Sequence, residues 1–253
     1  MANKIIFKKE KSTGRITLNN PKKLNALDFG MIIELHQILK QIQKSSLKAI
    51  VITGAGRAFC AGGDISWESK FGKMGKGEAK KQIKYVQEVF SKIEQLPQVF
   101  IALVNGIAVG GGNELAMACD IRVALPEAKF MHPENNLGTI APLGGTKRLP
   151  RLVGLGKSKY MLFTGELIDS KKALEWGLID FLVQHEKIND FMNSMLLRIG
   201  KNPIKATGLT KKSVNRNYLG DLNDGFEADS YVVLSRSPEN KKLLENLLRK
   251  NPN

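Results

Sequence analysis

The sequence predicts an α/β fold, in which buried strands alternate with helices. Short apolar runs, typical of buried strands, occupy residues 48–53, 99–104 and 121–124. Each run is followed by a turn and then by a helix or loop, so the three units form a coarse repeat of one strand and helix building block. The chain has 253 residues, of which 42% are hydrophobic, and can therefore bury a large core.

The first 43 residues predict a hairpin followed by an amphipathic helix. Residues 5–9 and 15–19 are short strands around a turn at 12–14. Asn25 or Asp28 can cap the helix that follows. Its apolar face repeats at helical spacing and consists of Met31, Ile32, Leu35, Ile38, Leu39 and Ile42.

A glycine-rich turn, FCAGGD at 59–64, comes after the strand at 48–53, and Asp64 is placed to cap the next segment. Residues 69–81 are rich in lysine and glycine and have little to bury. We expect them to form a mobile loop that can gate a site. A helix over 82–96 then leads to the central strand.

The last part of the chain, from about residue 157, has a mostly helical pattern with breaks at Gly177 and at 200–203. We therefore divide the chain into a core over 1–196 and a helical carboxy-terminal region over 197–253.

The central stretch, residues 98–120, places groups that can bind and react at the end of a strand. After the strand at 99–104 comes a glycine-dense turn and then a helix over 114–119. A helix that begins after glycines leaves backbone N–H groups pointing outward, where an anion is well held. Glu114 is the one carboxylate in the apolar residues 99–119, and desolvation should raise its pKa toward a value useful for proton transfer.

Composition excludes several classes of protein. There is no apolar run long enough for a membrane span and no secretory signal at residues 1–11, so we expect a soluble, cytoplasmic protein without a membrane partner. The net charge of +15 would suit RNA, but no aromatic or zinc pattern accompanies the lysines, and nucleic acid is disfavoured as a partner. Cys60 and Cys119 lack metal-ligand spacing, and neither a metal nor a separate cofactor is expected.

Glycine motifs for nucleotides fail when they are tested position by position. A dinucleotide fingerprint that starts at Gly54 needs glycine where Phe59 stands. A P-loop that ends in Gly156, Lys157 and Ser158 needs glycine where Arg151 stands. Two glycine turns that follow strands, and two glutamates, remain as candidates for a functional site.

Three motifs in the same order and spacing resemble the crotonase family, the enoyl-CoA hydratase/isomerase superfamily. They are FCAGGD at 59–64, NGIAVGGGNELAMACDIRVA at 105–124, and PENNLGT with GGTKRLPRLVG at 133–154. The resemblance implies a crotonase-like spiral of ββα units and a helical carboxy-terminal region used in trimerisation. It also implies an acyl-CoA thioester as substrate, a homotrimer or a hexamer built as a dimer of trimers, and a place in fatty acid metabolism.

The resemblance also assigns roles to residues. The N–H groups of Gly63 and Gly111 would form an oxyanion hole for the thioester carbonyl. Glu114 matches the first catalytic glutamate of the family, and we expect it to act as the base. Glu134, which follows Pro133, matches the second, and we expect it to act as the acid.

The substrate-binding residues implied by the same resemblance lie mainly around the two glycine turns. Ala26 and Ala61 would line the path of the coenzyme, and Lys22 or Lys23 would meet a phosphate. The acyl pocket would involve Trp67 and Leu143, although side chains of these types are ordinarily core residues. The expected binding residues are Lys22, Ala26, Ala61, Asp64, Ile65, Trp67, Pro142 and Leu143.

Two departures from the family pattern leave the reaction open. Pro142 stands where hydratases commonly have a glycine whose N–H helps to hold the water, and proline has no N–H. Asn113 adds a polar group beside Glu114. Hydration is the leading expectation. The alternatives are a 3,2-enoyl-CoA isomerase, a thioester hydrolase and, from another class, an RNA-binding protein on a crotonase scaffold.

Overall fold

The structure is a computed structural model that describes residues 3–217 and the single positions 233, 238 and 242. Its described residues form two β-sheets, with strand orders β1-β2-β3-β5-β7-β10 and β4-β6-β8-β9. The larger sheet consists of β1 (Ile5–Glu10), β2 (Thr13–Leu18), β3 (Ala49–Gly54), β5 (Val99–Val104), β7 (Ile121–Ala124) and β10 (Phe181–Leu182). The smaller sheet consists of β4 (Ala58–Cys60), β6 (Ile107–Val109), β8 (Lys129–Met131) and β9 (Ile168–Asp169).

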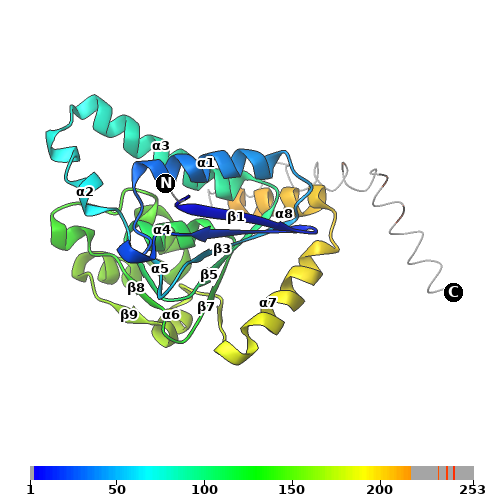
Figure 1. The fold of residues 1–253 in the computed structure, drawn as a ribbon. Helices are drawn as coiled ribbons and strands as arrows, with labels where there is room; N and C mark the ends of the chain where they lie inside the picture. The colour runs from blue at the N-terminus through cyan, green and yellow to red at the C-terminus, as the bar shows by residue number, and fades with distance from the viewer. Residues whose placement is uncertain (1–2, 218–232, 234–237, 239–241, 243–253) are drawn as a thin grey trace.

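Helices cover both faces of the larger sheet (Figure 1). The α-helices are α1 (Phe29–Gln43), α2 (Ile65–Glu68), α3 (Lys76–Gln95), α4 (Gly111–Ala118), α5 (Gly145–Thr164), α6 (Ser170–Trp176), α7 (His185–Gly200) and α8 (Ile204–Asn217). Short 3-10 helices are η1 (Pro21–Lys23), η2 (Phe71–Lys73) and η3 (Glu134–Leu137). Within the described residues, no helix is both long and apolar enough to cross a bilayer.

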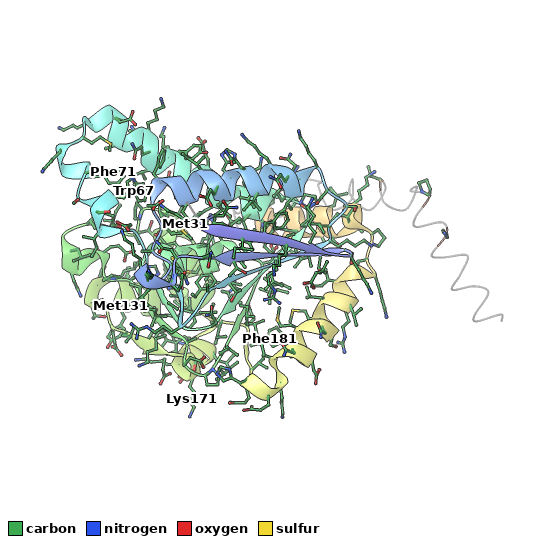
Figure 2. The ribbon with its side chains drawn as sticks, in the orientation of Figure 1. Met31, Trp67, Phe71, Met131, Lys171 and Phe181 are labelled. Atoms are coloured by element: carbon green, nitrogen blue, oxygen red, sulfur yellow. The ribbon has the colours of Figure 1, made fainter. Side chains whose placement is uncertain are left out.

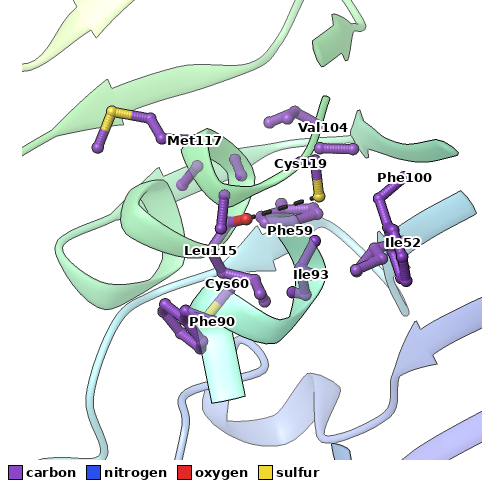
Figure 3. Close-up of a cluster of buried hydrophobic side chains, with 14 of the residues drawn as sticks. Ile52, Phe59, Cys60, Phe90, Ile93, Phe100, Val104, Leu115, Met117 and Cys119 are labelled. Atoms are coloured by element: carbon purple, nitrogen blue, oxygen red, sulfur yellow. Dashed lines mark hydrogen bonds between the residues drawn. The ribbon is translucent and has the colours of Figure 1, made fainter. Parts of the chain in front are cut away.

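The central strands β3 and β5 of the larger sheet are apolar on both faces because both faces are covered there. Ile52 and Phe100 point into the main core, against side chains of α3 and α4 such as Phe90 and Leu115 (Figure 3). Val51 and Ile101 point to the other face, where they pack against α7. The alternation follows from the two-residue period of a strand.

Several predicted elements are confirmed. β1 and β2 pair antiparallel as a hairpin, and β2, β3, β5 and β7 run parallel. Asp28, rather than Asn25, caps α1, because its side chain accepts a hydrogen bond of 2.9 Å from the Met31 N–H. Asp64 caps α2 through the Ser66 N–H in the same way. The predicted apolar face of α1 is buried.

The prediction of a loop over residues 69–81 is wrong in its second half. That segment contains η2, and α3 already begins at Lys76 instead of residue 82. Lysine, glutamate, alanine and glutamine are good helix formers, so the helix extends although its first turns bury little. The burial pattern therefore marked only the half of the helix that packs on the core.

Both glycine-rich turns contain a short strand that the sequence does not predict. β4 and β6, each three residues long, lie where residues 59–64 and 105–112 were interpreted as turns. A run of three residues is too short to show a strand period. α4 begins at Gly111, and α5 begins at Gly145 rather than near residue 157. Within α5 the backbone is non-helical at Gly154.

The carboxy-terminal part is only partly described. The predicted boundary between residues 196 and 197 falls inside α7, and α8 packs on α3, where Lys211 Nζ donates to the Ile93 carbonyl at 2.7 Å. Most of the predicted region beyond Asn217 lies outside the described residues. The division into two regions stays a prediction.

Candidate active site

The candidate site lies where three parallel strands of the smaller sheet end. β4, β6 and β8 are in parallel register, with Cys60 opposite Ala108 and Val109 opposite Met131. Carboxyl ends of parallel strands meet at one edge of a sheet, and ligands of open α/β sheets bind at such edges. The turns after these strands carry Gly63, Gly111 and Glu134, so the topology brings the predicted catalytic residues to one place.

The turn at 61–64 lies against the amino-terminal end of α4. A Cβ built on Gly62 would be 3.7 Å from the Gly111 nitrogen, and a Cβ on Gly111 would be 3.8 Å from the Gly63 nitrogen. No described residue accepts a hydrogen bond from the Gly63 N–H. Gly111 is the first residue of α4, where an N–H has no intrahelical partner. Two amides thus converge on the positive end of a helix.

Glu114 is fully buried in the first turn of α4. Its Oε1 accepts hydrogen bonds of 2.7 Å from the N–H groups of both Leu143 and Gly145. Desolvation raises its pKa to about 7, against the opposing effects of these two N–H donors and of His132, and with a further contribution from the neighbouring Glu134. Among the described residues, its Oε2 has no hydrogen-bond partner. One oxygen is therefore held, and the other is available.

Pro142 does not deprive Glu114 of backbone donors. The N–H groups beside it, those of Leu143 and Gly145, hold the carboxylate. The Pro142 carbonyl accepts a hydrogen bond of 2.6 Å from Gln87 Nε2 of α3, which ties this turn to the helix above it. The departure from the family pattern leaves the carboxylate in place, while Pro142 itself offers no N–H to a water.

Glu134 is the first residue of η3 and is also buried. It lies beside the turn that precedes α4, since a Cβ built on Gly110 would be 3.1 Å from Glu134 Oε1. Nδ1 of His132 is 3.4 Å from both carboxylate oxygens of Glu134, with hydrogen-bond geometry to Oε1 alone. Oε2 of Glu134 has no hydrogen-bond partner among the described residues. His132 thus contacts a predicted catalytic group.

The residues predicted to bind the coenzyme form one strip. The Leu27 N–H donates to the Gly62 carbonyl at 2.7 Å, and the Ala61 N–H donates to the Leu24 carbonyl at 3.0 Å, so Ala26 and Ala61 lie on adjacent segments. Lys23 pairs with Asp64, with Nζ and Oδ2 2.5 Å apart.

The pairing with Lys23, together with the Ser66 hydroxyl and N–H, lowers the pKa of Asp64 to about 2. Lys22 is exposed, as is Lys23, and the contact of either lysine with a phosphate stays a prediction.

The residues predicted for the acyl pocket separate into two groups. Leu143 lies at the site, because a Cβ on Gly111 would be 3.3 Å from its Cδ1. Trp67 belongs to the hydrophobic core and makes an edge-to-face contact with Phe71 (Figure 2). Its ring is also tilted against Phe29, and its Nε1 donates to Gln82. Ile65 is 82% exposed at the start of α2.

Sequence reasoning missed a third carboxylate, Glu68 at the end of α2. Its Oε1 would be 2.0 Å from a Cβ on Gly63, so it lies directly against the predicted oxyanion hole. Partial burial of the carboxyl group, followed by the charges of Glu134 and Asp64, raises its pKa. No motif marks this residue. Its spacing of four from Asp64 on a helix was the only available signal.

A large cavity in another part of the described structure is not a candidate active site, because it lacks the predicted catalytic residues. It has a volume of about 760 Å³ and is lined by α4, α5 and α8, without Glu114 or Glu134. Charged side chains on its wall are paired within the chain, such as Lys211 with Asp120 and Arg148 with Glu94. The described residues contain no group of histidine, cysteine and carboxylate side chains that could hold a metal.

Comparison with known proteins identifies the family of this chain. Its residues 8–247 match the model of the enoyl-CoA hydratase/isomerase family. The chain belongs to that family. The enoyl-CoA hydratase/isomerase assignment confirms the crotonase resemblance and the predicted fold class.

Curated relatives and solved structures agree with this family. The chain is 35% identical to a short-chain-enoyl-CoA hydratase of Clostridium acetobutylicum, over 98% of this chain and 95% of that protein. It is 34% identical to a crotonyl-CoA hydratase of Syntrophomonas wolfei, over 97% of this chain and 95% of that one. A crystal structure of an enoyl-CoA hydratase from Bacillus anthracis superposes with a TM-score of 0.91 at 31% identity, covering 98% of this chain and 97% of that chain.

Proposed function

We propose that this protein is an enoyl-CoA hydratase, which adds water across the 2,3 double bond of an acyl-CoA thioester. The observation that supports this most directly is the pair of buried glutamates beside two converging glycine amides. Each glutamate has one oxygen contacted by the protein and Oε2 without a described partner. One such oxygen can take a proton from water, and the other can give a proton to the same substrate.

In the proposed mechanism the thioester oxygen accepts hydrogen bonds from the Gly63 and Gly111 N–H groups. Glu114, as carboxylate, removes a proton from water while the water oxygen bonds to the β-carbon. The two electrons of the double bond move toward the carbonyl, and the amides stabilise the enolate. Glu134 then gives its proton to the α-carbon. Afterwards Glu114 carries the proton and Glu134 is the carboxylate, and exchange with solvent restores the starting state.

The direct test is the loss of the conjugated thioester absorbance when purified protein meets crotonyl-CoA. Rapid loss supports hydration. No loss with crotonyl-CoA or with longer, branched or cyclic 2-enoyl-CoA substrates would contradict the proposal and redirect attention to the alternatives.

The nearest alternative is isomerisation of a 3,4 double bond to the 2,3 position, which the absent N–H at Pro142 favours. Replacing Glu134 with glutamine is expected to abolish either reaction, because each needs proton transfer at the α-carbon. Replacing Glu114 with glutamine should abolish hydration alone. Assaying both variants with crotonyl-CoA and with a 3-enoyl-CoA separates the two activities. If the Glu114 variant retains full hydration, the assignment of the base is wrong.

Glu68 supplies a further prediction for the same reaction. Glu68→Gln is expected to raise kcat/KM for crotonyl-CoA about 3- to 10-fold at pH 8, because a carboxylate beside the oxyanion hole opposes the developing negative charge. Steady-state kinetics will measure this, with Glu175→Gln on the exposed side of α6 as a matched control. A large fall in kcat would instead make Glu68 a participant in proton transfer.

We also propose that the protein assembles into an oligomer through α5. α5 exposes a row of large apolar side chains, Leu155, Tyr160 and Phe163, which are 68%, 44% and 65% accessible. Such exposure is typical of a surface that another protein covers. This supports a homotrimer, or a hexamer built as a dimer of trimers, in which α5 contributes to the contact.

A further inference from the structure

A buried polar pair, Asn113 and His132, lies behind the two glutamates. Both side chains have no solvent exposure. Nδ2 of Asn113 is 3.1 Å from Nε2 of His132, and Nδ1 of the same ring is 3.4 Å from Glu134 Oε1. The histidine therefore joins the amide of one residue to the carboxylate of another.

The contact with Asn113 fixes the tautomer of the histidine. An amide NH₂ group can only donate, so the Nε2 atom that it faces must be an acceptor without a proton. The proton of the neutral ring is then on Nδ1, which points at Glu134. Because Nδ2 faces the ring, Asn113 Oδ1 points elsewhere and has no hydrogen-bond partner among the described residues.

The ring has little freedom to adopt another position. A Cβ built on Gly145 would be 3.3 Å from His132 Cε1 and 2.9 Å from Glu114 Oε1, so the ring is packed beside both α5 and the first glutamate. The charged groups that face it are Glu114 from α4 and Glu134 from η3, while Glu68 from α2 acts on Glu134. All three are carboxyl groups.

We propose that His132, held as its Nδ1–H tautomer by Asn113, is a positioning residue that orients the carboxyl group of Glu134. The inference rests on the proposed hydratase function. Nδ1 is 3.4 Å from both oxygens of Glu134 but has hydrogen-bond geometry only to Oε1. Because Nδ1–H donates to Oε1, the carboxyl proton is placed on Oε2, which has no hydrogen-bond partner among the described residues. When Glu134 gives that proton to the α-carbon, the same donor stabilises the carboxylate left behind. The distance of 3.4 Å is long for a hydrogen bond, and catalytic contacts of this kind tighten when substrate binds.

The tautomer can be tested without any activity. The chain has only three histidines, His36, His132 and His185. Two-bond ¹⁵N–¹H correlation spectra of the full-length protein report the protonation of each ring nitrogen, and His132→Gln identifies the His132 signals. We expect a proton on Nδ1 and none on Nε2. A proton on Nε2, or on both nitrogens, would overturn the proposal, since Asn113 would then have to present Oδ1.

The positioning role is tested by kinetics with crotonyl-CoA. His132→Leu should lower kcat about 10- to 100-fold with KM nearly unchanged, because a hydrogen bond to a charged group is lost while substrate contacts remain. His132→Gln should recover most of this loss, because its amide can again donate to Glu134. A merely structural role predicts no such rescue.

The control is His185→Gln, an exposed histidine paired with Glu127 far from the site, which should behave as wild type. Full kcat in a folded His132→Leu variant, or a loss confined to KM, would overturn the proposal. If His132→Leu fails to fold, the tautomer proposal is still tested by the spectra of the wild type and the His132→Gln variant. If the wild type hydrates no enoyl-CoA, the proposed function fails, and the spectra alone judge the tautomer.

Discussion

Replacing Glu114 with glutamine is expected to lower kcat for crotonyl-CoA hydration by about 10²- to 10⁴-fold, the usual contribution of a general base. Glutamine keeps an oxygen for the N–H groups of Leu143 and Gly145, so the turn above α4 should stay in place. What it removes is the ability of Oε2 to accept a proton from water. Stopped-flow or steady-state absorbance will measure the effect.

The pH dependence of the wild type adds a second readout for the same residue. With a pKa of about 7, Glu114 becomes a carboxylate as the pH rises through neutrality, so kcat should increase from pH 6 to pH 8. Glu10→Gln, on the exposed end of β1, is the matched control and should keep the wild-type rate and profile. An unchanged rate in the Glu114 variant would exclude it as the base.

The same substitution should make the protein more stable at alkaline pH. The pKa of Glu114 is about 7 in the folded state and 4.5 ordinarily, so folding favours the protonated form. The wild type therefore loses stability as the pH rises from about 4.5 to 7, and the full penalty is present above that window. At 1.36 kcal/mol for each pKa unit, the separation corresponds to about 3 kcal/mol.

Urea unfolding at two pH values will test this effect. Glu114→Gln should gain less than about 1 kcal/mol at pH 5 and about 3 kcal/mol at pH 8.5, because glutamine carries no charge to bury. A gain that is the same at both pH values would show that ionisation of Glu114 does not limit stability. Lost activity with gained stability is the signature of a strained functional group.

The parts of the fold that sequence predicts well are those whose pattern is long. The strands at 49–54 and 99–104 stand out as continuous apolar runs, and the face of α1 repeats over enough residues to show its helical period. β4 and β6 are three residues long and lie among glycines, so their pairing depends on partners distant in sequence. α3 extends past its buried half by helix propensity alone, which burial patterns do not reveal.

The candidate site shows the same division. Gly63, Gly111, Glu114 and Glu134 could be predicted because the turns that carry them have recognisable motifs. Glu68 could not, because its approach to Gly63 depends on the direction of α2, a helix of four residues. Asn113 stands out in the sequence, but its contact with His132 requires α4 and the turn after β8 to be packed together.

The row of turns at the ends of β4, β6 and β8 also bears on how such an enzyme can diversify. Each turn contributes a separate part: one amide after β4, a second amide with Glu114 after β6, and Glu134 with His132 after β8. The strands below hold these parts in register. A mutation in one turn can therefore alter proton transfer while carbonyl recognition persists, which lets new reactions evolve through active intermediates.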